Sequence, residues 1–133
     1  MKIFVDVNIF IYAAGRPHAF KEASTRLIHR IGEGREDAAV DTEVLQELLY
    51  RYWQAKAVNE GLRLCEQAMR LVTDILPVGR QDIDVAQRVL QEQRTIEPRD
   101  AIHAAVMLNH GITHLYSYDR HFDLIAGLTR LEP

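Results

Sequence analysis

Short apolar segments alternate with longer amphipathic segments along the whole chain, and this alternation restricts the fold more than any other feature. The apolar segments cover residues 2–5, 38–40, 75–78 and 112–118, and they have the length and composition of buried strands. The amphipathic segments carry apolar residues at helical spacing over residues 19–31, 42–52, 59–71, 82–93 and 98–109, and a shorter helix is expected at 9–14. Strands separated by helices predict a three-layer α/β/α sandwich around a central parallel sheet.

Several residues indicate where the predicted helices begin and end. Asp41 is suited to cap the helix that starts at residue 42, Pro98 suits a first helical turn, and Gly111 suits a C-terminal stop. In the segment 59–71 and just after it, five residues are expected to form the buried stripe, namely Leu62, Cys65, Ala68, Met69 and Val72.

Length and composition predict a single domain over residues 1–133. No repeat, low-complexity stretch or Pro/Gly-rich linker divides the sequence. Cys65 is the only cysteine, so an intramolecular disulfide and a cysteine metal cage are excluded, and a reducing cytoplasm is expected. Asp6 interrupts the first apolar run too early for a signal peptide or a membrane span. The formal net charge of −3 gives no general attraction to nucleic acid, so RNA binding would depend on local basic residues.

Four acidic residues are expected to meet at one edge of the sheet. Asp6 and Asp119 directly follow predicted strands, and Asp100 lies in the first turn of a predicted helix. Glu47 lies about five residues, roughly 7 Å, into the helix that follows the second strand. In parallel sheets, functional sites form beyond the carboxyl ends of the strands, where the following helices begin.

Crowded carboxylates repel one another unless a cation or a proton offsets their charge. Mg²⁺ and Mn²⁺ prefer oxygen ligands, and such ions can polarise a phosphoryl oxygen and activate water. The pattern therefore favours phosphodiester hydrolysis. Each acid taken alone also has a structural interpretation, because Asp6, Asp100 and Asp119 each lie where an acid stabilises the start of a helix or a turn. Glu47 alone would be interpreted as a solvated helix residue paired with Arg51.

Four segments that occur in order make the interpretation more specific: FVDVN at 4–8, TEVLQE at 42–47, RDAIHAA at 99–105 and LYSYDRHFD at 115–123. Together they resemble the PIN-domain family, and within it the VapC-type toxins of bacterial toxin–antitoxin pairs. The resemblance implies a Mg²⁺-dependent endoribonuclease that is inhibited by a partner antitoxin and forms a homodimer. By motif position, the catalytic and metal-binding acids of the family fall on Asp6, Glu47, Asp100 and Asp119.

The same motifs imply supporting positions and two departures from the family pattern. Asn8 and Ser117 fall on supporting polar positions, although threonine is common where Ser117 stands. Val7 stands where a hydroxyl residue is common, but neither departure removes a carboxylate. Asp123 is either a fifth acid that acts through water or a surface acid.

Basic residues close to the acids are candidates for contact with RNA phosphates. Arg51, Arg99 and Arg120 neighbour Glu47, Asp100 and Asp119 in the sequence, and a solvated surface arginine is the alternative for each. The six histidines have no zinc-site spacing and are expected at the surface or in packing: His18, His29, His103, His110, His114 and His121.

Three other functions compete with this interpretation. A phosphoaccepting signalling domain would have paired acids after the first strand and a lysine after the last one, whereas no lysine follows Lys56. A haloacid-type phosphatase would need an Asp-x-Asp motif, and the first motif here is Asp-Val-Asn. A non-catalytic or processing-type PIN domain that serves as an RNA-binding module remains the alternative that only an activity assay separates.

Overall fold

The computed structural model describes residues 1–133, and at its centre lies a sheet of five parallel strands. The strands are β1 (Lys2–Val5), β2 (Asp37–Asp41), β3 (Asp74–Leu76), β4 (His114–Tyr116) and β5 (Thr129–Leu131). Their order in the sheet is β3-β2-β1-β4-β5, and every neighbouring pair is parallel. The first strand of the chain, β1, is thus the middle strand of the sheet, with β2 on one side and β4 on the other.

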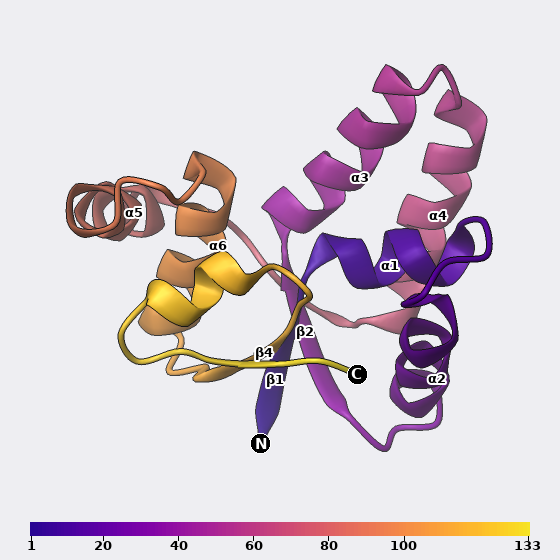
Figure 1. Ribbon diagram of the computed structural model, residues 1–133, viewed down its shortest axis with the longest axis horizontal. Coiled ribbons are helices and arrows are strands. Elements are labelled where there is room, and N and C mark those ends of the chain that lie inside the picture. The colour runs from indigo at the N-terminus through magenta and orange to yellow at the C-terminus, as the bar shows by residue number, and fades with distance from the viewer.

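Helices cover both faces of this sheet. They are α1 (Val7–Ala14), α2 (Lys21–Gly32), α3 (Thr42–Gln54), α4 (Val58–Leu71), α5 (Arg80–Glu92) and α6 (Pro98–Asn109), with a short 3-10 helix η1 at Arg120–Leu124. In Figure 1, α1, α2 and α4 lie on one side of the strands, and α5 and α6 lie on the other. The predicted three-layer parallel architecture is therefore confirmed.

The predicted boundary residues of α3 and α6 act as expected. The backbone N–H of Val44 donates to Asp41 Oδ1 at 2.9 Å, which satisfies a group that the first turn of a helix leaves unpaired. Pro98 is the first residue of α6, and Gly111 follows its end with a φ of 66°, a left-handed conformation that glycine adopts without strain.

The core forms where the sheet meets the helices. Phe4 of the central strand, Leu48 of α3 and Met107 of α6 are completely buried, as are Leu115 of β4 and Phe122 of η1. Burial of such side chains is the dominant stabilising contribution to folding. It fixes β1 as a rigid support for the residues that follow its carboxyl end.

Two expectations about strands need correction. The last predicted strand, residues 112–118, is regular only at His114–Tyr116. The sequence does not predict β5, because three residues are too few to show an alternating pattern. This strand lies at the sheet edge and pairs with β4 alone.

The stripe predicted for α4 is right in part. Cys65, Ala68 and Val72 are buried, but Leu62 and Met69 were predicted wrongly, since they are 54% and 48% exposed. The helix is rotated so that Gly61 faces α3, where an added Cβ would lie 2.6 Å from Tyr52 Cβ. The small residue therefore permits the close approach of α3 and α4.

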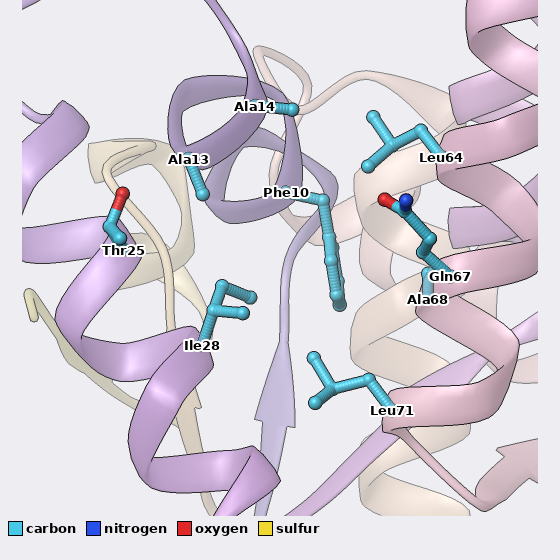
Figure 2. Close-up of a pocket in the computed structure, with 9 residues that line it drawn as sticks. All are labelled: Phe10, Ala13, Ala14, Thr25, Ile28, Leu64, Gln67, Ala68 and Leu71. Carbon is cyan, nitrogen blue, oxygen red and sulfur yellow. The ribbon is translucent and has the colours of Figure 1, made fainter.

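An apolar hollow lies between α1, α2 and α4. It encloses about 260 Å³, and Figure 2 shows Phe10 and Ile28 on opposite helices pointing into it, with Leu64 and Leu71 of α4 facing them. Ala14 forms part of its rim and is exposed. No helix of the structure combines the length and apolarity that a membrane crossing requires.

Candidate active site

The four acids that the sequence singles out line one polar pocket of about 200 Å³ at the carboxyl edge of the sheet. Asp6 follows β1, Glu47 lies in α3, Asp100 lies in the first turn of α6, and Asp119 follows β4. Six further residues line the pocket: Val7, Asn8, Arg51, Glu97, Arg99 and His121. The topology thus brings together side chains that are up to 113 positions apart in the sequence (119 − 6).

Asp6 and Asp119 are held by hydrogen bonds that leave little freedom. The Val7 backbone N–H donates to Asp6 Oδ1 at 2.8 Å, and the Ser117 hydroxyl donates to Asp6 Oδ2 at 2.6 Å. Ser117 Oγ in turn accepts from the Asp119 backbone N–H at 3.0 Å. Ser117, which is completely buried, therefore links the Asp6 carboxylate to the backbone at Asp119.

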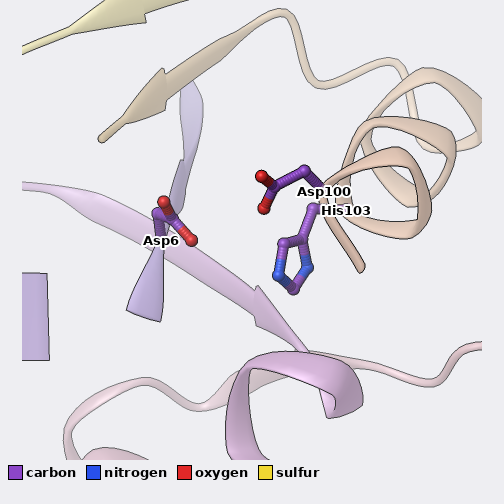
Figure 3. Close-up of side chains that lie close together, drawn as sticks. All are labelled: Asp6, Asp100 and His103. Carbon is purple, nitrogen blue, oxygen red and sulfur yellow. The ribbon is translucent and has the colours of Figure 1, made fainter. Parts of the chain in front are cut away.

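Burial and mutual repulsion change the acidity of two carboxyl groups. Burial raises the pKa of Asp6 above its ordinary value, despite the hydrogen bond from Ser117. The pKa of Asp100 is raised to about 8, first by burial and then by contact with Asp119 and the charge of Asp6. Figure 3 shows Asp100 reaching from α6 and Asp6 from the end of β1. Without a cation, the cluster therefore retains a proton near neutral pH.

Glu47 differs from these acids because positive groups surround it. Its Oε2 lies 3.3 Å from Arg51 Nη2 and 3.8 Å from Arg99 Nη1, and its Oε1 lies 3.7 Å from His103 Nε2. Burial disfavours the charged form, but His103 and the two arginines outweigh it and lower the pKa of Glu47. The Glu47 carboxylate therefore stays ionised in the metal-free protein.

His103 and Asp41 are the functional candidates that sequence reasoning missed. His103 is a core residue as expected, but its Nδ1 also makes a 2.7 Å contact with Asp41 Oδ2 in the completely buried interior. Burial disfavours the charged ring, yet Asp41 and Glu47 raise the pKa of His103 well above its ordinary value. The available signal was the position of His103 one helical turn after Asp100, on the same face of α6.

Three buried polar atoms around the pocket have no hydrogen-bond partner: Asn8 Oδ1, Glu47 Oε1 and His103 Nε2. A polar atom that is buried without a hydrogen bond raises the free energy of the folded state, so such atoms indicate a ligand-binding or other functional role. Two of them are oxygens of residues that line the pocket, next to four further carboxylates. Such an oxygen donor set fits a hard divalent cation. Asp6, Asp100 and His103 also offer atoms within 4.8 Å of one another, but His103 does not line the pocket.

The basic and accessory candidates are separated by the structure. Arg51 and Arg99 line the pocket, whereas the exposed Arg120 does not. Asp123 is also outside the pocket. Both of its carboxylate oxygens accept hydrogen bonds from Arg130, at 3.0 and 3.3 Å. The geometry therefore favours the surface-acid interpretation of Asp123.

The chain is similar to known proteins over nearly its full length. Residues 3–128 match the model of the PIN domain. The chain is 38% identical to ribonuclease VapC13 of Mycobacterium tuberculosis over 129 residues, which cover 97% of this chain and 98% of that protein. It is 29% identical to ribonuclease VapC23 of the same species, over 88% of this chain and 92% of the relative.

Solved structures share the fold over nearly the full length. The Mycobacterium tuberculosis VapC20 toxin, described as cleaving the sarcin-ricin loop, matches with a TM-score of 0.78 at 22% identity, over 98% of this chain and 99% of that one. A chain of VapBC2 from Rickettsia felis, bound to a promoter DNA fragment, matches with a TM-score of 0.77 at 16% identity, over 99% and 98% of the two chains.

Proposed function

The chain belongs to the PIN-domain family, and we propose that it is a divalent-metal-dependent endoribonuclease, the toxin component of a type II toxin–antitoxin pair. The observation that carries this proposal is the pocket itself, where Asp6, Glu47, Asp100 and Asp119 converge beside two arginines. The relatives named as VapC ribonucleases supply the substrate class, RNA.

Different residues of the pocket have different proposed roles in phosphodiester hydrolysis. Arg51 and Arg99 line the pocket and would bind an RNA phosphate there, because arginine pairs well with phosphate oxygens. Asp6, Asp100 and Asp119 are the proposed metal ligands, and Ser117 joins the Asp6 carboxylate to the backbone of Asp119. Glu47 stays ionised and is placed either to ligate the metal or to accept a proton from the attacking water.

A divalent ion bound by these acids would polarise the phosphoryl group and stabilise the leaving oxygen. Its positive charge would also replace the proton that the cluster holds through Asp100. We propose Mg²⁺ or Mn²⁺, because the donors that line the pocket are oxygens.

We further propose a protein partner and a second copy of the chain. One solved neighbour is a toxin–antitoxin complex from Klebsiella pneumoniae, and others are VapBC complexes. The apolar hollow between α1, α2 and α4 is the candidate surface for the antitoxin, since apolar segments bind in such grooves. We also propose that the chain forms a homodimer and acts on cellular RNA in the cytoplasm.

Cleavage of single-stranded RNA by the purified protein tests the activity. We expect endonucleolytic products with Mg²⁺ or Mn²⁺, no products in excess EDTA, and loss of cleavage in Asp6→Asn. Persistence of cleavage in EDTA would refute the metal mechanism. RNA binding without cleavage in any divalent metal would favour a non-catalytic RNA-binding module.

Expression in bacteria tests the toxin assignment separately. Synthesis of the protein without its antitoxin should arrest growth, whereas the Asp6→Asn protein at the same level should not. Equal toxicity of the two forms would show that growth arrest does not come from the acid pocket.

A further inference from the structure

We propose that His103, anchored by Asp41, is a positioning residue that holds the Glu47 carboxylate in the acid pocket. This inference rests on the proposed metal-dependent nuclease function. It assigns a role to a buried pair that is outside the four-acid pattern.

The ring of His103 lies between two carboxylates. Nδ1 is 2.7 Å from Asp41 Oδ2, and Nε2 faces Glu47 Oε1 at 3.7 Å. Nδ1 is within hydrogen-bond distance of Asp41, whereas Nε2 and Glu47 Oε1 face each other at a distance longer than a hydrogen bond. Neither Nε2 nor Oε1 has a hydrogen-bond partner, so each is a buried polar atom that faces the other. Carboxylate oxygens of Asp6 and Asp100 also lie within 4.8 Å of a His103 ring nitrogen.

His103 lies in the core beneath the pocket and is not part of the pocket lining. The side chain is completely buried, it is not among the residues that line the pocket, and its ring packs against Phe4 of the core with a centroid distance of 5.4 Å. A ligand or substrate in the pocket therefore meets Glu47, whereas His103 influences it through Glu47.

The same ring links the two helices that carry proposed metal ligands. His103 follows Asp100 by one turn of α6, while Asp41 caps α3 and Glu47 lies in the second turn of that helix. The contacts of His103 with Asp41 and Glu47 thus tie α6 to α3. They set the position of Glu47 relative to Asp100.

The second oxygen of Glu47 shows why such a tie is needed. Oε2 faces Arg51 and Arg99, whose side chains are 46% and 34% exposed, so both arginines draw the carboxylate toward solvent. His103 Nε2 is the polar group that faces the carboxylate from the buried side, at 3.7 Å from Oε1. Without it, we expect Glu47 to move toward the arginines and away from the other acids.

Mn²⁺ titration followed by electron paramagnetic resonance tests this role without RNA, because the signal of free Mn²⁺ falls as the ion binds. His103→Asn places an amide where Nδ1 lies and loses the group at Nε2, whereas His103→Gln places its amide nitrogen near the position of Nε2. We expect about tenfold weaker Mn²⁺ binding in His103→Asn, the scale typical of residues that orient metal ligands. His103→Gln should stay within about threefold of the wild type.

The double variant shows whether His103 acts through Glu47. In a Glu47→Gln background, His103→Asn should change Mn²⁺ affinity by less than about twofold. His110→Asn, at the end of the same helix and outside the pocket, is the matched control and should leave affinity unchanged. Melting temperatures of all variants report folding. If His103→Asn does not fold, His103→Gln is compared with the wild type, and a loss of Mn²⁺ affinity of more than about threefold overturns the positioning role.

The outcomes separate this inference from the proposed function. Additive effects of His103→Asn and Glu47→Gln, or weaker binding in His103→Gln than in His103→Asn, would overturn the positioning role while the metal site stands. A nitrogen coupling to bound Mn²⁺ would overturn it as well, because His103 would then be a ligand. A wild-type protein that binds no Mn²⁺ would refute both the inference and the metal-dependent function.

Discussion

Replacing Asp100 by Asn separates a catalytic acid from a structural helix-start residue. Asp100 is the third residue of α6, is largely buried, and lies near Asp6 and Asp119. Its pKa is raised to about 8 from an ordinary value of 3.8. Between these values the native state binds more protons than the unfolded state, so the free energy of unfolding falls as pH rises from about 4 to about 8.

The size of the effect follows from this difference in pKa. About 4 pKa units at 1.36 kcal/mol per unit give roughly 6 kcal/mol as an upper limit. Because water and side chains rearrange around a charge, we expect about half of this, ~3 kcal/mol. Asp100→Asn removes the carboxyl group that ionises, so at pH 9 in EDTA the variant should melt roughly 10 °C above the wild type. At pH 5 the difference should shrink to about 3 °C, because most of the pH-dependent loss of wild-type stability lies above that pH. Mg²⁺ should stabilise the wild type far more than the variant.

Thermal melts from pH 5 to 9, with EDTA and with Mg²⁺, measure these differences. Asp82→Asn is a matched control, because Asp82 is also a buried acid at the third position of its helix but accepts a hydrogen bond from the Gly79 N–H outside the acid pocket. It should be destabilised at every pH. If Asp100→Asn behaves like Asp82→Asn and retains RNA cleavage, Asp100 stabilises the start of α6 and is not a metal ligand.

Two further predictions concern the surfaces around the pocket. Arg51→Ala and Arg99→Ala should each weaken RNA binding in filter-binding assays and lower its salt slope by about 1, whereas Arg120→Ala, outside the pocket, should not; equal effects of all three would place the RNA path elsewhere. Ala14→Arg should weaken co-purification with the antitoxin while RNA cleavage is unchanged, and Ala55→Arg, also exposed but away from the hollow, is its control. Undiminished co-purification of Ala14→Arg would show that the partner binds another surface.

Elements with strong local signals could be predicted from the sequence. The segments of β1, α3 and α6 combine apolar patterns with boundary residues such as Asp41 and Pro98, and their positions agree with the structure. The edge strand β5 lacks any local signal, since its regular structure depends on pairing with β4. The rotation of α4 likewise depends on the contact of Gly61 with Tyr52, which no periodicity reveals.

The site was predictable where a rule of topology applies. Parallel strands direct their carboxyl ends to one edge, so Asp6 and Asp119 were expected together, and they share Ser117. The link between His103 and Asp41 joins residues 62 positions apart and depends on how α6 packs against the start of α3. Spacing within one segment cannot specify such a contact.

The positions of the acids also explain why each one alone has an ordinary structural interpretation. Asp6 caps α1, Asp119 caps η1, and Asp100 occupies the first turn of α6, so each lies where backbone N–H groups carry partial positive charge. These helix starts stabilise the carboxylates in the absence of metal, although not enough to offset burial at Asp6 and Asp100. A divalent ion in the proposed metal site would neutralise the remaining excess of negative charge. In the proposed function, the fold would assemble the site before the cation binds, and the affinity for the cation would come from the repulsion that the helix starts leave uncompensated.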